Sequence, residues 1–112
     1  MSNNPQIVSF DTLRSLAFGS IGATYAPVGV AFTHPVRLVS FDNATDGDLF
    51  VSDDGVNDKL FMPAGTFKLF DLNTNRNLID QVWVLPVGTQ IYVRYGTAPS
   101  SKAFYVACLW GL

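Results

Sequence analysis

Two stretches of the chain decide the fold: Lys59-Leu-Phe-Met-Pro-Ala-Gly-Thr-Phe-Lys-Leu-Phe-Asp71 and, 23 residues later, Val82-Trp-Val-Leu-Pro-Val-Gly-Thr-Gln-Ile-Tyr-Val-Arg-Tyr95. Each is a short apolar run, then Pro-x-Gly-Thr, then a run in which apolar and polar residues alternate. Pro63 and Pro86 have a fixed φ and lack an N–H, so a strand ladder stops there, and the glycine that follows allows the chain to turn. Tyr25-Ala-Pro-Val-Gly-Val30 is a weaker third copy. The repeated unit of strand, stiff turn and strand predicts an antiparallel β-protein.

Alternating residues predict further strands on both sides of these stretches. The pattern is clearest in Val36–Asp42, which is followed by turn residues in Asn43-Ala-Thr-Asp-Gly47. Asp48–Ser52 then predicts a partner strand, so we expect these two strands to form a hairpin. We also expect Val36 and Leu38 to share one face of their strand, because they are two residues apart.

The last apolar segment, Ala103–Trp110, predicts a strand in the middle of a sheet. One of its faces carries Phe104, Val106, Cys108 and Trp110, and the other carries Tyr105, Ala107 and Leu109. Both faces are therefore apolar, and an exposed strand of this kind would aggregate.

Short strands, frequent turn residues and the lack of a convincing helix predict an all-β fold. We expect an antiparallel, jelly-roll-like β-sandwich of about eight short strands, with a small closed barrel as the alternative. Residues 11–112 are assigned to this single domain and the polar residues 1–10 to an N-terminal arm, which is either a frayed terminus or a contact to a neighbouring subunit. Weaker patterns at residues 13–18 and 23–30 predict two of the strands, although Asp11 or Thr12 can also cap a helical turn.

The composition favours association with other proteins over nucleic acid or membrane. Charged residues make up 14 % of the chain, against ~25 % in an average soluble domain. The apolar excess fits either a core rich in Phe and Val or a surface that a partner covers. The formal net charge is −2 and the basic residues are scattered, which argues against direct nucleic-acid binding. Apolar runs are too short for a membrane span, and residues 1–6 do not read as a signal peptide.

Histidine and cysteine, the residues that hydrolytic triads and most transition-metal sites require, each occur once. His34 is in a predicted loop and Cys108 in a predicted apolar strand, where we expect a buried thiol. A Cys–His nucleophilic pair would require the fold to bring them together. A jelly-roll metal site needs several histidines. We therefore predict no enzyme, and assign no catalytic, cofactor-binding or metal-binding residues.

Aspartates are concentrated in two predicted loops. Asp46-Gly-Asp48 and Asp53-Asp-Gly-Val-Asn-Asp58 place five carboxylates within 13 residues. Oxygen-rich loops can bind Ca²⁺, but the spacing does not match a helix–loop–helix calcium loop, whose last ligand is a Glu, and this chain contains no Glu. We expect these Asp and Asn side chains to cap the turns of their own loops.

Exposed aromatic residues would suit a sugar-binding platform. Trp83, Tyr92, Tyr95 and Trp110 are the candidates, although aromatic residues in alternating strands lie mostly in the core. A carbohydrate-binding module is therefore kept as an alternative, which predicts that Trp83 and Trp110 are exposed side by side.

The run Phe41-Asp-Asn-Ala-Thr-Asp-Gly-Asp-Leu-Phe-Val-Ser-Asp-Asp-Gly-Val-Asn-Asp-Lys-Leu-Phe-Met-Pro-Ala-Gly65 resembles small virion proteins of tailed bacteriophages. A second match is Leu85-Pro-Val-Gly-Thr-Gln-Ile-Tyr-Val-Arg-Tyr95, followed by Ala98-Pro99 and the final apolar strand. The resemblance covers roughly residues 41–110 and consists of turn-and-strand patterns. With the size and apolar character of the chain, it is closest to capsid decoration proteins, also called cement or staple proteins, of short-tailed phages.

That resemblance implies a specific role. Such a protein is expected on the outside of an icosahedral capsid, made in the host cytoplasm, where it binds the major capsid protein and bridges its neighbouring copies. Self-association is expected too, with a dimer favoured over a trimer. No contact residue of the family can be transferred. A head–tail or tail component of the same kind of virion is the nearest alternative.

Overall fold

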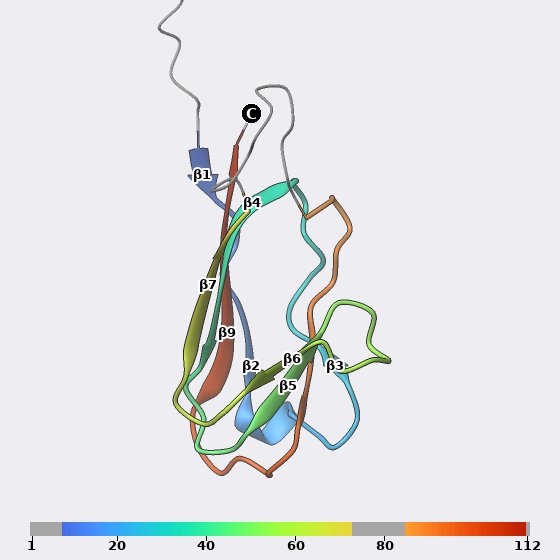
Figure 1. Cartoon of the computed structure of the whole chain (residues 1–112), viewed down its shortest axis with the longest axis vertical. Helices are drawn as coiled ribbons and strands as arrows, with labels where there is room; N and C mark the ends of the chain where they lie inside the picture. Colours follow the sequence, from blue (N-terminus) through green and yellow to red (C-terminus); the bar gives the residue numbers. More distant parts are fainter. Residues whose placement is uncertain (1–7, 73–84, 112) are drawn as a thin grey trace, which may run out of the picture.

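Two antiparallel sheets pack face to face in the computed structural model, which describes residues 8–72 and 85–111 (Figure 1). The five-stranded sheet contains β1 (Val8–Phe10), β2 (Arg14–Ala17), β4 (Val36–Asn43), β7 (Phe67–Asp71) and β9 (Ala103–Gly111). The four-stranded sheet contains β3 (Ala26–Pro27), β5 (Leu49–Ser52), β6 (Leu60–Met62) and β8 (Tyr92–Tyr95). A single 3₁₀ turn, η1 (Phe18–Ser20), follows β2.

The strand pairs are nested around the connection between β5 and β6. Moving outward from that hairpin, β4 pairs with β7, β3 with β8 and β2 with β9, all antiparallel. A long hairpin rolled up in this way gives the orders β2-β9-β4-β7 and β3-β8-β5-β6, which is the arrangement of an eight-stranded jelly roll. The predicted all-β, jelly-roll-like sandwich is confirmed, with β1 as an additional short strand beside β9.

The predicted hairpin between Val36–Asp42 and Asp48–Ser52 is wrong. β4 lies between β7 and β9, so both of its hydrogen-bonding edges are occupied, and β5 belongs to the other sheet. The connection is a corner that crosses between the sheets. The buried Asn43 side chain holds it by donating to the carbonyl groups of Gly47 and Met62, both at 3.0 Å. Turn residues of the same kind build hairpins and corners, so their presence alone does not distinguish the two.

Both Pro-x-Gly-Thr segments form the same turn. The proline carbonyl accepts hydrogen bonds from the backbone N–H and the hydroxyl of the threonine, at 3.2 and 2.6 Å from Thr66 to Pro63 and at 3.1 and 2.7 Å from Thr89 to Pro86. The glycines have φ values of 71° and 90°, which the third position of a type II turn requires. The first turn carries the chain from β6 in one sheet to β7 in the other. The apolar residues 82–84 and the predicted loop 73–77 lie outside the described residues.

β9 is central in its sheet, as predicted, with β4 on one side and β1 and β2 on the other. Phe104, Val106 and Cys108 point into the core, where they meet residues of the four-stranded sheet such as Leu49 and Val93. Trp110, expected on the same buried face, is only partly covered.

A β-bulge corrects the predicted faces of β4. The pairing register with β9 shifts between Val36 and Leu38, so Val36 is buried together with Val39 instead of sharing a face with Leu38. The rest of the strand alternates, with Val39 and Phe41 inward and Leu38, Ser40 and Asp42 outward.

The N-terminal boundary differs from the predicted one. Val8–Phe10, assigned above to a polar arm, pair with the end of β9 as β1, while residues 1–7 lie outside the described part.

No helix in the described part of the chain is long and apolar enough to cross a bilayer.

Candidate interaction surfaces

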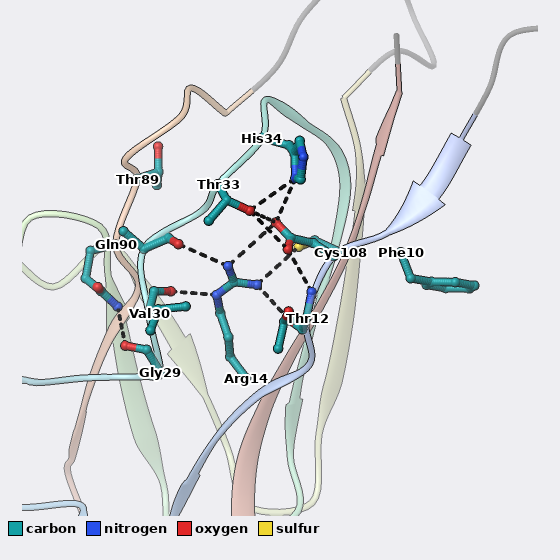
Figure 2. A network of polar contacts seen from close by, with 12 residues as sticks. Phe10, Thr12, Arg14, Gly29, Val30, Thr33, His34, Thr89, Gln90 and Cys108 are labelled. Carbon is teal, nitrogen blue, oxygen red and sulfur yellow. Dashed lines mark hydrogen bonds and ion pairs between the residues drawn. The ribbon is translucent and has the colours of Figure 1, made fainter.

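His34 and Cys108 belong to one polar network, which the sequence did not predict (Figure 2). Arg14, at the start of β2, stands at its centre and is 2 % exposed. Its guanidinium donates to the carbonyl groups of Val30 at 2.6 Å, Thr12 at 2.7 Å and Ala31 at 3.1 Å. It also lies 3.6 Å from the Asp11 carboxylate and 3.8 Å from the Cys108 sulfur.

The chemistry of this network is structural. Burial raises the pKa of the Cys108 thiol, and the group beside the sulfur is the Arg14 guanidinium, which cannot act as a base. The His34 imidazole instead faces Thr33 at 3.1 Å and Asp11 at 3.8 Å, with its ring stacked on Trp110 at 3.8 Å. Although burial raises the pKa of Asp11, the backbone N–H of Thr12 and the charge of Arg14 outweigh it and hold that pKa below its usual value. The network fastens the segments before β2 and β4 to the end of β9.

The aspartates of the 53–58 loop are used to shape the loop itself. The carboxylate of Asp54 accepts hydrogen bonds from the Ser52 hydroxyl, from the N–H groups of Val56 and Asn57, and from the Asn57 side chain. These bonds, the one from Ser52 foremost, lower the pKa of Asp54. Asp46 in the other loop accepts from the hydroxyl and N–H of Ser100, which lower its pKa too. Within residues 8–72 and 85–111, no group of three or more His, Cys or Asp side chains is placed to hold a metal ion.

Asp58 ties this loop to the outer face of the four-stranded sheet. Its carboxylate accepts from Arg94 Nε at 3.0 Å, from Arg94 Nη2 at 2.6 Å, and from the Tyr25 hydroxyl. The hydrogen bond from Arg94, followed by that from Tyr25, lowers the pKa of Asp58. Burial, followed by the hydrogen bond to Asp58, raises the pKa of Tyr25 to about 12.

Aromatic rings surround Arg94 on that face. The guanidinium carbon lies 4.3 Å from the centre of the Phe50 ring and 5.7 Å from that of Tyr25. Phe61 on the edge strand β6 packs against Phe50, with ring centres 5.1 Å apart. We call Tyr25, Phe50, Phe61 and Arg94 the arginine–aromatic face. Alternation places these strand residues outward, because Leu49, Val51, Met62 and Val93 point into the core.

The outer face of the five-stranded sheet is different in kind. We call it the apolar face, and its outward residues are Phe10, Leu38, Ser40, Phe67, Leu69, Tyr105, Ala107 and Leu109. Phe10 is 79 % exposed, Phe67 61 % and Leu69 54 %; Figure 2 shows the Phe10 ring pointing away from the Arg14 network. Asp42 and Asp71 lie at opposite ends of the face, so its middle carries no charge.

Side chains of different size meet in the middle of the apolar face. Ser40 lies between Leu69 on β7 and Ala107 on β9, so two small side chains stand next to one that is 54 % exposed. An uncharged sheet face of this kind can pack against a second copy of itself across a two-fold axis.

A cavity of about 360 Å³ opens between the two sheets. Its lining is apolar and includes Val39, Phe41, Val51, Phe70 and Ile91. Lys59 and Asp53 stand at its border and form an ion pair with each other at 3.3 Å. The third polar residue of the lining, Ser52, donates its hydroxyl to the Asp54 carboxylate at 2.7 Å.

The three described candidates for a sugar platform are not gathered in one place. Tyr95 packs against the core and Trp110 is covered by His34 on one ring face. Tyr92 lies beside Gly55 under the 53–58 loop. The fourth candidate, Trp83, lies outside the described residues.

The arginine–aromatic face was missed in the sequence, because strand pairing decides which outward residues become neighbours. The available signal was the alternation itself: with Leu49 and Val51 inward, Phe50 must point outward.

No family model, curated protein or solved structure matches the chain.

Proposed function

We propose that the protein is a non-enzymatic virion component that binds the outside of an icosahedral phage capsid and bridges neighbouring major capsid proteins. The observation that carries the proposal is the apolar face: Phe10, Phe67 and Leu69 project from a rigid sheet into solvent. Exposed apolar patches of this extent mark association surfaces. The turn-and-strand resemblance to capsid decoration proteins is the reason for proposing a phage capsid as the particle that the protein binds.

A second copy of the chain is the proposed occupant of the apolar face. Homodimer interfaces are more apolar than transient ones, and the middle of this face carries no charge. With strands ~4.8 Å apart, four strands across and the length of β4 along, the face measures roughly 400–500 Å² in projection. That is about half of the ~800 Å² per partner of a standard interface and close to the lower limit of roughly 500 Å² per partner for a specific one.

Dimerisation would explain bridging. A dimer presents two copies of any remaining surface, so it can hold two shell subunits at once, and the second contact benefits from high effective concentration. The Arg14 network and the Asp54 loop make the scaffold stiff, so little ordering free energy is lost on binding.

The proposal is tested by adding the purified protein to DNA-filled heads of the encoding phage that were assembled without it. The expected result is saturable co-sedimentation at many copies per head, and a higher temperature of DNA release. Saturation at one vertex would instead indicate a tail component. Binding to host polysaccharide without heads would indicate a carbohydrate-binding module. Either result, or no binding to heads, would overturn the proposal.

A further inference from the structure

We infer that the arginine–aromatic face of the four-stranded sheet is the surface that contacts the shell, an inference that rests on the proposed function. This face lies on the opposite side of the sandwich from the apolar face, so both can be occupied at the same time. Tyr, Phe and Arg are enriched at interfaces, and Tyr and Arg at the few positions that supply most of the binding free energy.

The face is organised before any partner arrives. Arg94 is held at 3.0 and 2.6 Å by the Asp58 carboxylate, and its guanidinium carbon lies 4.3 Å from the centre of the Phe50 ring. Arginine usually loses considerable side-chain entropy on binding, and here that loss has already occurred on folding. Phe61 stands beside this pair on an edge strand and is 47 % exposed.

The unused donors of Arg94 define the partner's chemistry. Asp58 accepts from Nε and Nη2, and Nη1 makes a longer bond of 3.4 Å to the Tyr95 carbonyl. The Tyr25 hydroxyl also interacts with the guanidinium, so at least one of the five N–H groups remains for a partner and needs an acceptor once it is buried. The Asp58 carboxylate already pairs with the Arg94 guanidinium at 2.6 Å, so a partner carboxylate would gain little there. The fitting partner is an apolar protein surface that covers Phe61 and offers main-chain carbonyl groups to Arg94.

The competing explanation is that Arg94 only anchors the 53–58 loop. A substitution of Phe61 distinguishes this explanation from the proposed contact. Phe61 packs on Phe50, whereas the loop is held by Arg94, Asp58 and Tyr25. A change at Phe61 alters the surface and leaves the anchor in place.

The experiment compares full-length Phe61→Asp with wild type in binding to heads assembled without the protein. We expect at least 10-fold weaker binding, with unchanged self-association in sedimentation. Val87→Asp is the matched control, because Val87 is also an exposed apolar residue, 58 % exposed, on the turn after Pro86; it should bind as wild type does. Phe61→Ser repeats the test without a charge, in case Phe61→Asp fails to fold.

The outcomes separate the two proposals. If wild type binds heads and folded Phe61→Asp and Phe61→Ser bind equally well, the inference is overturned while the proposed function stands. If wild type does not bind heads, the proposed function fails and the inference falls with it. Equal weakening by Val87→Asp would also overturn the inference, because the effect would not be specific to this face.

Discussion

The two outer faces of the sandwich are built on different chemistry. Across the apolar face, Leu69, Ser40 and Ala107 run from strand to strand with carboxylates only at the ends. On the arginine–aromatic face, Arg94 forms an ion pair with Asp58, and its guanidinium lies near the rings of Phe50 and Tyr25. The first suits a permanent contact that excludes water. The second suits a face that is exposed to solvent before it binds a particle, because the Asp58 carboxylate and most of the Arg94 donors already have hydrogen-bond partners.

The difference also teaches that a protein proposed to bind a particle does not need an apolar contact surface on both of its faces. A protein with two apolar faces would polymerise, because heterologous contacts of that kind do not close. One apolar and one polar–aromatic face allow closed pairing first and attachment afterwards.

The largest effect should come from the buried arginine, which supports both faces without belonging to either. Arg14→Ala leaves three backbone carbonyls without their donor and the Asp11 carboxylate without its ion-pair partner. We expect a loss of about 3–5 kcal/mol in the free energy of unfolding, measured by urea denaturation. The matched control, Arg94→Ala on the surface, should cost much less, because solvent screens its ion pair with Asp58. Equal losses in the free energy of unfolding would contradict the claim that burial makes Arg14 more important for stability than Arg94.

Self-association should depend on the apolar face alone. Leu69→Asp places a charge at the middle of that face, and a two-fold axis would bring two such charges near each other. We expect the dimer dissociation constant to rise at least ~100-fold, which corresponds to about 3 kcal/mol. Analytical ultracentrifugation measures it, with Val87→Asp as the control. If the dimer survives Leu69→Asp and dissociates with Phe61→Asp, then the arginine–aromatic face, and not the apolar face, mediates self-association.

Acid should loosen the arginine–aromatic face before the apolar face. The pKa of Asp58 is lowered in the folded protein, so its stabilising contribution is present above the unfolded value of ~3.9 and is lost as pH falls through the lower folded value. Protection factors for the amides of residues 53–58 should therefore drop as the pH falls below about 4, while those of β4 and β9 stay high. Asp54 titrates in the same loop with a lowered pKa. Asp58→Asn should show low protection already at neutral pH, with a weaker dependence on acid.

The smallest effect is expected at Lys102, just before β9. Its φ of 66° is in the left-handed region, which costs an ordinary side chain about 1 kcal/mol and glycine almost nothing. Lys102→Gly should raise the free energy of unfolding by about 0.5–1 kcal/mol, measured by denaturation. Because this change is confined to the scaffold, dimerisation and head binding should stay as in wild type. A change in either would show that the faces are coupled to the scaffold.

Local rules predicted local features of this molecule well. The Pro63 and Pro86 turns, the inward face of β9 and the capping role of Asp54 all follow from residue chemistry within a few positions. The long-range arrangement was less accessible. The Asn43–Gly47 segment contains hairpin residues but forms a corner, because β7 and β9, distant in sequence, occupy both edges of β4.

The surfaces were the least predictable part. Alternation can place Leu69 or Phe50 outward, but which outward residues become neighbours depends on pairing register. Arg94 therefore meets Phe50 only once β5 and β8 are known to pair. The meeting of His34, Asp11, Arg14 and Cys108 has the same origin, because it requires three separate segments to converge.

A density map of phage heads carrying this protein tests the central claim most directly, since it locates both faces at once. The account predicts density for paired β-sandwiches outside the shell, with Leu69 at the two-fold contact and Phe61 and Arg94 against shell subunits. Density confined to one vertex, absent from the outer surface, or turned so that the arginine–aromatic face points to solvent would contradict it.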